Sequence, residues 1–548
     1  MATSPRRKLS LLRLLILVLA VVGLGAAGWT QGSEAFRRIT AKPAVTWFAP
    51  YDDVTLTPTY HFEDLVVSPS LAQVLGFVVA DPGSGCAPTW GTYYDLDGAG
   101  RALDLDRRIT RLRERGGDVV ISFGGAANNE LAVSCTDQAA LDAAYASVVQ
   151  RYDARTLDFD IEGTALADAP SIARRAIAIA TLERTARQAG RPLRVWLTLP
   201  VTPQGLPREA AALVSATLQG GAKLAGVNVM TMDYGGSKPA GQSMRAANEL
   251  ALRATFRQLG AIYRRAGQPL SRHQLWAHIG ATPMIGQNDI PGQTYSLSDA
   301  RALVSLANRL GLGRVSMWSA NRDAPCGVQQ ADGGQVSNTC SGIAQRPLAF
   351  TWELGRLNAR LPGAARVSSK DEPVRALSRD DPATSPYPIW RPRKTYQLND
   401  EVVWHERVYE AKWSTQGSLP DAPVAHLWDT PWRYIGPVLP SDAQARPQEL
   451  RPWSADQVYL EGDRVIFDGS IFRAKWWTQA NVPVADLNHP GDTPWAFVMK
   501  AGGSEPDIKA AGAQPQAAVT PVTPVARVKP KALKPVRPPR VSHRRAGP

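Results

Sequence analysis

The strongest constraint on the fold of this chain is a repeated unit that fills residues 44 to 361. In each unit a short β-branched or apolar run is followed by a turn and an amphipathic stretch, as at 169–190, which is rich in Ala, Arg and Leu at helical spacing. Eight such units predict a (β/α)8 barrel, an α/β fold whose active sites lie at the carboxyl ends of the strands. The predicted strand runs are 45–50, 74–80, 118–125, 156–163, 194–201, 226–236, 275–284 and 314–323.

The fourth run, TLDFDIEG at 156–163, alternates large apolar residues with acids. The acids are Asp158, Asp160 and Glu162, and the residues between them are Leu157, Phe159 and Ile161. Because side chains on a strand alternate between its two faces, one face is acidic and the other apolar. Acids about 6.5 Å apart on one face raise one another's pKa where water is scarce. A solvent-facing edge strand with salt bridges is the structural alternative, and the apolar flanks favour a buried functional cluster instead.

Other polar clusters also fall where predicted strands end. They are Ser122 to Gly125, Asp233 with Tyr234, and Trp318 to Asp323. In a barrel these ends meet at one mouth, so we expect the clusters to surround the acidic strand. Ser122 to Gly125 is interpreted as a tight turn that supports the site.

These segments resemble the strand signatures of family 18 glycoside hydrolases, the chitinases. The matching segments are SFGG at 122–125, LDFDIEG at 157–163, VNVMTMDYG at 227–235 and VSMWS at 315–319. The resemblance covers residues 44–362 and implies a TIM-barrel hydrolase of β-1,4 bonds between N-acetylglucosamine units. It implies no cofactor and no metal, and no Cys/His spacing in the chain suggests a metal site.

The resemblance assigns roles to the acids. The family pattern D-x-x-D-x-D-x-E puts the general acid at Glu162, and Asp158 and Asp160 complete the run, whereas Arg155 replaces the outermost Asp. A proton donor must stay protonated near neutral pH, which neighbouring carboxylates favour in a desolvated site. In the family the substrate's own acetamido carbonyl attacks the sugar, so Asp160 would orient and stabilise the oxazolinium that forms.

The resemblance also implies substrate contacts at two other strands. The family commonly has M-x-Y-D on strand six, whereas MTMDY in this chain puts Met232 and Asp233 at the last two positions, with Tyr234 following. Tyr234 is predicted to supply the missing hydroxyl contact if the strand has already ended, and Met232 to line the site. Trp318 matches the family's apolar floor under the reactive sugar, with ordinary core packing as the alternative.

An internal repeat with an offset of 63 occupies the aromatic zone after residue 388. AKWSTQ at 411–416 matches AKWWTQ at 474–479, and DTPW recurs at 429–432 and 492–495. The copies resemble two small all-β chitin- and cellulose-binding modules of families 5 and 12. Ser414 replaces one tryptophan, so the first copy should bind more weakly. The predicted stacking residues are Tyr396 and Trp413 in the first copy and Tyr459, Trp476 and Trp477 in the second, while Trp390, Trp432, Trp453 and Trp495 are predicted core.

The predicted domain organisation follows from these patterns. It comprises a signal peptide or membrane anchor at 1–29, the catalytic barrel at 44–362, a linker at 363–388, the first module at 389–437, a linker at 438–451, the second module at 452–500 and a disordered basic Pro/Ala-rich tail at 501–548.

The net charge of +13 lies at the two ends of the chain. Four cations precede the first apolar run and nine lie beyond residue 508, which leaves 14–508 formally neutral. A nucleic-acid groove in the folded body is therefore not expected. We interpret the tail as a solvated spacer, with binding to an anionic surface as the alternative.

The N-terminal sequence predicts export. Basic residues precede an apolar run from Leu14 to Trp29, which is typical of a signal that is cleaved or kept as a membrane anchor. We expect an extracellular, cell-surface or periplasmic location, where disulfides form. Cys326 and Cys340 are close in sequence and should staple one loop, which leaves Cys86 to pair with Cys135.

The sequence therefore predicts an exported, monomeric endo-chitinase whose partners are chitin and N-acetylglucosamine oligomers. Two alternatives remain open. One is a non-catalytic chitin-binding lectin on a degenerate barrel, and the other is a hydrolase of another N-acetylated glycan.

Overall fold

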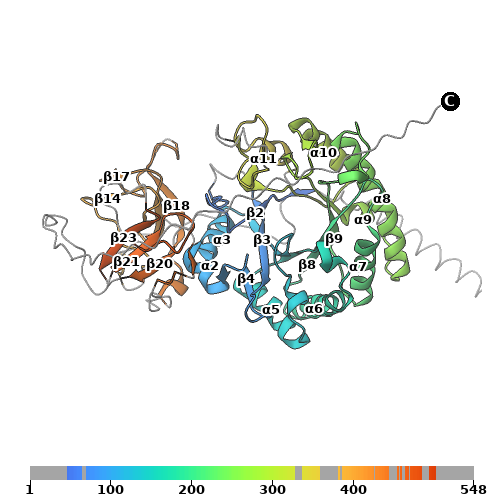
Figure 1. Cartoon of the computed structure of the whole chain (residues 1–548), viewed down its shortest axis with the longest axis horizontal. Helices are drawn as coiled ribbons and strands as arrows, with labels where there is room; N and C mark the ends of the chain where they lie inside the picture. Colours follow the sequence, from blue (N-terminus) through green and yellow to red (C-terminus); the bar gives the residue numbers. More distant parts are fainter. Residues whose placement is uncertain are drawn as a thin grey trace, which may run out of the picture.

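The computed structural model describes residues 46–64, 70–326, 336–357, 380–382, 385–424, 426–443, 453–455, 457–459, 463–467, 470–483 and 493–500. Figure 1 shows a ring of helices around an inner ring of strands, with a separate group of β-strands beside it. The predicted signal or anchor at 1–29 and the predicted tail at 501–548 lie outside the described residues. Within the part that is described, no helix is long and apolar enough to span a bilayer.

The inner ring is a closed parallel barrel, which confirms the predicted fold class. Its first strand is interrupted at Ala49 and Pro50 and pairs on both sides: β1 (Trp47–Phe48) with β13 (Arg314–Val315), and β2 (Tyr51–Asp53) with β3 (Ala72–Ala80). This double pairing closes the sheet. The remaining barrel strands, in spatial order after β3, are β6 (Asp118–Gly124), β7 (Thr156–Asp160), β8 (Arg194–Pro200), β9 (Gly226–Met230) and β10 (Ile279–Thr282).

Helices cover the outside of the barrel because the outward side chains of the strands are apolar. Leu157 and Phe159 on β7 are fully buried there, and Phe159 stacks on Phe123 with ring centroids 5.0 Å apart. The principal helices are α2 (Leu96–Ala102), α3 (Leu105–Glu114), α4 (Leu131–Ser134), α5 (Gln138–Arg151), α6 (Ala169–Gln188), α7 (Arg208–Gln219), α8 (Met244–Arg265), α9 (Arg272–Ala277), α10 (Leu297–Leu310) and α11 (Ala349–Leu354).

One predicted strand run begins too early. The run at 275–284 was expected to be extended throughout, but Leu275, Trp276 and Ala277 form the last turn of α9, and β10 starts at Ile279. Ser271 explains the difference, because its side chain and that of Gln274 form a capping box that starts a helix.

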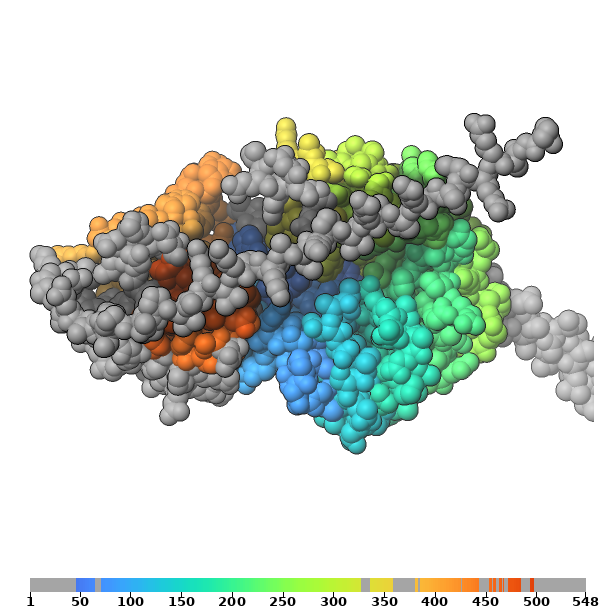
Figure 2. Space-filling model, in the orientation of Figure 1, coloured from blue at the N-terminus to red at the C-terminus, as the bar shows by residue number. Residues whose placement is uncertain are grey.

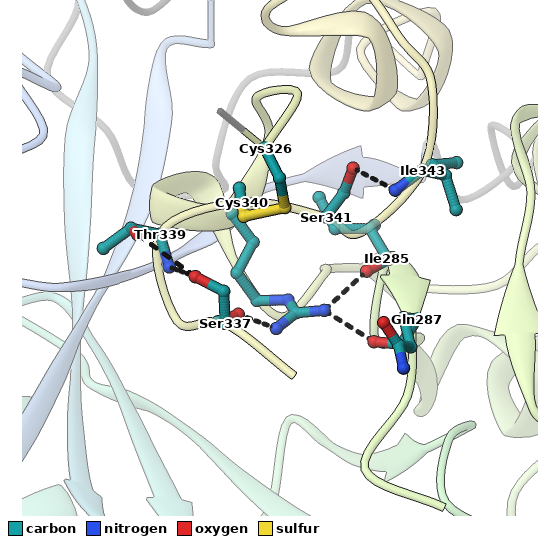
Figure 3. Close-up of a disulfide and its surroundings, with 9 residues drawn as sticks. Ile285, Gln287, Cys326, Ser337, Thr339, Cys340, Ser341 and Ile343 are labelled. Carbon is teal, nitrogen blue, oxygen red and sulfur yellow. Dashed lines mark hydrogen bonds between the residues drawn. A yellow bond between two sulfur atoms is a disulfide. The ribbon is translucent and has the colours of Figure 1, made fainter. Parts of the chain in front are cut away.

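The two disulfides join the cysteine pairs expected from the sequence. Cys86 bonds Cys135, and Cys326 bonds Cys340. Figure 3 shows the second disulfide beside Ile285 and Gln287, close to the hairpin formed by β11 (Gly286–Gln287) and β12 (Thr294–Tyr295). It therefore cross-links a loop that follows the last barrel strand.

The C-terminal β-strands form two copies of one arrangement, each with a two-stranded and a three-stranded antiparallel sheet. In both copies an Ala of the middle strand pairs with a buried Trp, Ala411 with Trp432 and Ala474 with Trp495. The first copy contains β14 (Thr395–Tyr396), β15 (Glu401–Trp404), β16 (Arg407–Ala411), β17 (Thr415–Gln416) and β18 (Trp432–Pro437). The second contains β19 (Val458–Tyr459), β20 (Arg464–Phe467), β21 (Ser470–Ala474), β22 (Thr478–Gln479) and β23 (Trp495–Lys500).

The first module packs against helix α3 of the barrel. Figure 2 shows the C-terminal strands, in orange and red, as a group beside the blue part of the barrel. Arg107 on α3 is 3% exposed and donates to the carbonyl of Pro437 at 2.6 Å. Its two terminal nitrogens also bond the carboxylate of Asp442 at 2.9 and 3.0 Å. A bidentate, buried Arg–carboxylate pair of this kind fixes orientation as well as distance.

The described end of the predicted linker takes part in this interface. Tyr387 donates to Asp104 at 2.8 Å, and Asp104 in turn bonds Arg107 at 3.1 Å. Asp380 accepts from the backbone N–H groups of His405 and Glu406 at 2.9 and 2.6 Å. These residues therefore hold the first module to the barrel and are not a free connection.

Arg107→Ala is expected to lower the free energy of unfolding by about 3 kcal/mol, because it leaves two buried carboxylates at the interface without their cation. Urea unfolding followed by tryptophan fluorescence measures the change. Arg208→Ala is the control, since Arg208 is 94% exposed and its pair with Glu209 should contribute little. Superimposable unfolding curves for the two variants would show that the interface does not depend on Arg107.

Candidate active site

The acidic strand β7 has the two faces that its alternation predicts. Leu157 and Phe159 pack outward under the helices, whereas Asp158 and Asp160 point into the barrel. Glu162 lies two residues beyond the strand end and is partly buried. The three acids therefore run from the interior of the barrel toward its carboxyl end.

Asp158 is completely buried and accepts four hydrogen bonds from side chains on other strands. Its Oδ1 accepts from Thr198 at 2.7 Å and from Arg314 at 2.6 Å. Its Oδ2 accepts from the hydroxyls of Tyr51 at 2.7 Å and Ser122 at 2.8 Å. Both oxygens are thus saturated, which makes Asp158 a fixed negative charge with no capacity left for a ligand.

Arg314 is the only cation paired with these three acids among the described residues. It is completely buried, and its guanidinium also donates to Ser316 at 2.8 Å and to Tyr51 at 3.1 Å. Removing either Arg314 or Asp158 would leave an unpaired charge in the barrel interior. Arg314 therefore balances Asp158 and leaves the next acid of the strand without a cation of its own.

Asp160 is 6% exposed, and its Oδ1 has no hydrogen-bond partner among the described residues. Burial, followed by the charges of Glu162 and Asp158, raises the pKa of Asp160 well above its usual range. Buried carboxyl oxygens are rarely left unpaired in native proteins. The free oxygen is therefore available to a donor that the protein itself does not supply.

Burial raises the pKa of Glu162 to about 7, and the negative charge of Asp233 adds to this effect. A carboxyl group with this pKa carries a proton in a large fraction of molecules at neutral pH. It can give that proton to a bound group and later take one back, which are the two requirements of a general acid and base.

Asp233 is held in place by backbone groups of the neighbouring loop. Its Oδ1 accepts from the N–H of Ile290 at 3.1 Å, and its own N–H donates to Asn288 at 3.3 Å. Burial raises the pKa of Asp233, although backbone hydrogen bonds from Ile290 and Asp289 to its carboxyl group oppose the rise. Arg322 fixes β11, the strand that precedes this loop, because it donates to the carbonyls of Ile285 at 3.1 Å and Gln287 at 2.6 Å.

Trp318 belongs to an aromatic group at the barrel mouth. Its ring stacks on Phe77 with centroids 5.6 Å apart and lies 6.0 Å from the ring of Tyr51. Since the hydroxyl of Tyr51 bonds Asp158, this aromatic surface is directly joined to the acidic strand. Trp318 remains partly exposed, so it can offer ring surface to a ligand.

The SFGG turn supports the acidic strand at close range. Gly124 has φ of 98°, and a Cβ there would lie 2.1 Å from the carbonyl oxygen of Asp160. The N–H of Gly125 donates to that same oxygen at 2.9 Å. Only glycine allows this approach, so the turn sets the position of the Asp160 backbone.

The prediction that Tyr234 contacts the substrate is wrong. Its ring is buried in the outer core, and its hydroxyl donates to Asn248 on α8 at 2.8 Å. Strand β9 ends at Met230, and Asp233 adopts a left-handed conformation with φ of 47°, which turns the next side chain toward the helix. Met232 is 8% exposed, so it packs inside and offers little surface.

The aromatic residues of the two modules divide into exposed and buried sets. Trp413, Trp476 and Trp477 are 45%, 41% and 55% exposed, as a stacking role requires. Tyr396 and Tyr459 are 1% and 6% exposed, which contradicts their predicted role.

The two tyrosines are buried because each fills the small core of its module. Tyr396 packs edge-on against Trp432, and Tyr459 packs in the same way against Trp495. Each hydroxyl also accepts a backbone N–H five residues away in the chain, at 2.7 and 2.6 Å. The tryptophans predicted to be core, Trp390, Trp432 and Trp495, are buried, and Trp453 is partly buried.

Three residues of the barrel site were missed by sequence reasoning. Tyr51 directly follows the predicted run 45–50, and Phe77 and Arg314 lie in the predicted runs 74–80 and 314–323. An arginine at the start of a buried strand is the one local signal, because such a charge needs a buried partner. Among the described residues no group of three His, Cys, Asp or Glu side chains could hold a metal ion.

Comparisons with known proteins find one matching family model and several similar proteins. Residues 452–496 match Carbohydrate-binding module family 5/12. Over 307 residues, 55% of this chain, it is 37% identical to "Probable bifunctional chitinase/lysozyme" of Escherichia coli (strain K12), of which 33% is covered. Over 311 residues, also 55% of the chain, it is 35% identical to "Endochitinase 11" of Metarhizium anisopliae, of which 57% is covered.

The chain thus spans between one third and about three fifths of the length of these two curated relatives. Among solved structures, the catalytic domain of a hyperthermophilic chitinase from Pyrococcus furiosus has 27% sequence identity and a TM-score of 0.49. That match covers 59% of this chain and 97% of the other.

Asp233→Asn is expected to lower the pKa of Glu162 below about 7, because the substitution removes a negative charge that disfavours ionisation of Glu162. Carbon-13 NMR titration of side-chain-labelled glutamate measures this pKa, with Glu162→Gln identifying the resonance. Asp153→Asn, which removes a 49% exposed carboxylate before the start of β7 and thus at the opposite end of the strand from Glu162, should leave the titration unchanged. An unchanged or raised pKa in Asp233→Asn would refute the coupling.

Proposed function

We propose that the protein is an exported endo-acting chitinase that hydrolyses β-1,4 bonds between N-acetylglucosamine units. The observation that carries the proposal is a carboxyl group with a pKa of about 7, Glu162, beside a buried aspartate whose Oδ1 lacks a partner. The chitinases among the relatives described above support the choice of substrate.

The proposed reaction begins with proton transfer from Glu162 to the glycosidic oxygen. The acetamido carbonyl oxygen of the substrate bonds to the anomeric carbon as the bond to the leaving sugar breaks, and an oxazolinium forms. Glu162 then takes a proton from water, and the water oxygen bonds to the anomeric carbon. The bond between that carbon and the acetamido oxygen breaks, which opens the oxazolinium ring and restores the acetamido group. Two displacements at one carbon retain its configuration.

Asp160 has a separate role in this scheme. Its unpartnered Oδ1 is suited to accept the N–H of the acetamido group, which would turn the carbonyl oxygen toward the anomeric carbon. The carboxyl oxygen that accepts this N–H also stabilises, through its partial negative charge, the positive charge that develops on the oxazolinium. Asp158 contributes through its fixed charge, which favours retention of a proton by Asp160 before substrate arrives.

The aromatic surface of Trp318 and Phe77 is proposed to bind the reacting sugar. Pyranose rings have apolar faces, and a flat indole buries much of such a face at little cost in side-chain entropy. The contact between Trp318 and Tyr51 would set the height of the sugar relative to the acids. Asp233 helps to keep the proton donor Glu162 protonated, because the negative charge of Asp233 adds to the effect of burial in raising the pKa of Glu162.

The C-terminal modules are proposed to adsorb the enzyme to insoluble chitin. The match of 452–496 to a carbohydrate-binding family and the exposure of Trp476 and Trp477 support this role. Two weak sites on one chain raise the overall affinity for a polymer, because binding of one increases the local concentration of the other.

Export is proposed from the N-terminal sequence and the two disulfides. A basic and then apolar leader is typical of exported chains, and disulfides persist in oxidising compartments. A membrane-anchored form remains part of this proposal.

A non-catalytic lectin would bind the same polymer, but it would have no use for a glutamate whose pKa lies near 7. Hydrolysis of another N-acetylated glycan is the second alternative, and the name of the Escherichia coli relative includes lysozyme. Comparing turnover of chitohexaose with turnover of peptidoglycan separates these functions.

Glu162→Gln is expected to reduce hydrolysis of chitohexaose by at least about a thousandfold, because the amide cannot donate the proton while its shape is preserved. Binding of the oligomer should persist, as measured by tryptophan fluorescence quenching. Asp153→Asn, at the opposite end of β7, serves as the control for a distant carboxyl. Turnover by Glu162→Gln near the unaltered rate would refute the assignment of the donor.

Replacing Trp476 and Trp477 together by Ala is expected to lower adsorption to insoluble chitin by about tenfold, because two exposed aromatic contacts are lost. Pelleting of the protein with chitin measures adsorption, and the rate on chitohexaose is measured in parallel. A smaller loss on the soluble oligomer is expected, since it does not require surface adsorption. An equal loss on both substrates would argue against a separate adsorption role.

A further inference from the structure

The first module lacks one tryptophan of the binding motif but has an exposed tryptophan elsewhere. Ser414 stands where the second module has Trp477, and Trp428 stands where the second module has Gly491. Trp428 is 63% exposed, which is more than Trp413, Trp476 or Trp477. Each copy therefore carries two exposed tryptophans in the regions compared, but at different sequence positions.

The fold brings Trp428 toward the remaining tryptophan of the motif. Lys412 links the two segments, because its ammonium donates to the carbonyl of Leu427 at 2.7 Å and lies 4.9 Å from the ring centroid of Trp413. The backbone N–H of Lys412 also bonds Pro431 at 2.7 Å. The turn that carries Trp428 is thus tied to the strand end that carries Trp413.

The indole of Trp428 is held by a second ring. His426 stacks beneath it with ring centroids 4.5 Å apart and planes inclined by 16°. The turn is closed by the N–H of Asp429, which donates to the carbonyl of His426 at 2.9 Å. One face of the indole is therefore braced while the other stays open, which reduces the entropy lost when a ligand stacks on it.

We propose that Trp413 and Trp428 together form a chitin-binding face on the first module, with Trp428 replacing the tryptophan that is missing at Ser414. This inference rests on the proposed function for the identity of the polymer. The occupant is a β-1,4-linked N-acetylglucosamine chain, because a pyranose polymer offers apolar ring faces to both indoles. Lys412, whose ammonium lies beside Trp413, supplies a donor for the acetyl carbonyl or a ring hydroxyl.

The inference changes the expectation for the first module. The sequence motif alone predicts weaker binding there, because Ser414 cannot stack on a sugar. The position of Trp428 restores two aromatic contacts with a different spacing, since Trp413 and Trp428 come from separate segments whereas Trp476 and Trp477 are consecutive. The two modules should therefore bind chitin with comparable strength through differently shaped faces.

The contact between the first module and the barrel gives this face a fixed location. Arg107 and Tyr387 hold the module through partly buried hydrogen bonds, so the two tryptophans keep one orientation relative to the catalytic strand. A preorganised second site gains avidity without the entropy cost of ordering a free domain.

The test uses the full chain with three substitutions as the background protein. Glu162→Gln prevents digestion of chitin, and Trp476→Ala with Trp477→Ala removes the exposed rings by which the second module would bind it. Adding Trp428→Ala is expected to lower the remaining adsorption to insoluble chitin by about tenfold, the usual scale for loss of an aromatic anchor. Trp428→Tyr should retain most of it, because a smaller ring still stacks. The control is Trp352→Ala, which removes a 64% exposed tryptophan from α11 of the barrel.

The proposal is overturned if Trp428→Ala adsorbs like Trp352→Ala, if Trp428→Tyr binds as poorly as Trp428→Ala, or if the background protein does not adsorb at all. Failure of the proposed function is distinguishable, because it would appear as absence of chitohexaose hydrolysis by the unaltered protein. Near-ultraviolet circular dichroism of each variant confirms that the module remains folded.

Discussion

The buried ion pair between Asp158 and Arg314 is the interaction on which the active site depends. It places one fixed negative charge and one fixed positive charge inside the barrel, and every hydrogen-bonding position of the Asp158 carboxylate is filled by another strand. Because Arg314 is committed to Asp158, the next acid along β7 has no cation of its own. Burial and the charges of Glu162 and Asp158 raise the pKa of Asp160 well above its usual range, and burial with the nearby charge of Asp233 raises the pKa of Glu162 to about 7.

The barrel provides the geometry that this electrostatic arrangement requires. Parallel strands place Tyr51, Asp158 and Arg314 at one level of the barrel although they are far apart in the chain. The turn at Gly124 fixes the backbone of Asp160. The aromatic surface of Trp318 joins the same network through Tyr51. The proton donor, the orienting carboxyl and the proposed sugar-binding surface are therefore coupled through a few buried contacts.

The sequence predicted the barrel, the acidic strand and the internal repeat well, because alternation and repeated motifs are local patterns. It failed where a side chain's role depends on tertiary packing. Tyr396 and Tyr459 looked like sugar platforms but fill the small cores of their modules. Tyr234 was assigned to the site, but the backbone turns at Asp233 and directs it to α8. The contact of the first module with α3 left no signal, because Arg107 looks like any surface arginine of a helix.

The central claim is that a neutral Glu162 donates a proton to a substrate whose own acetamido group is the nucleophile. The most direct measurement compares hydrolysis of chitohexaose with hydrolysis of the fully deacetylated hexamer by the unaltered protein under the same conditions. The account predicts rapid cleavage of the acetylated oligomer and no detectable cleavage of the deacetylated one. Equal rates on the two oligomers would contradict it, because the nucleophile would then have to come from the protein or from water.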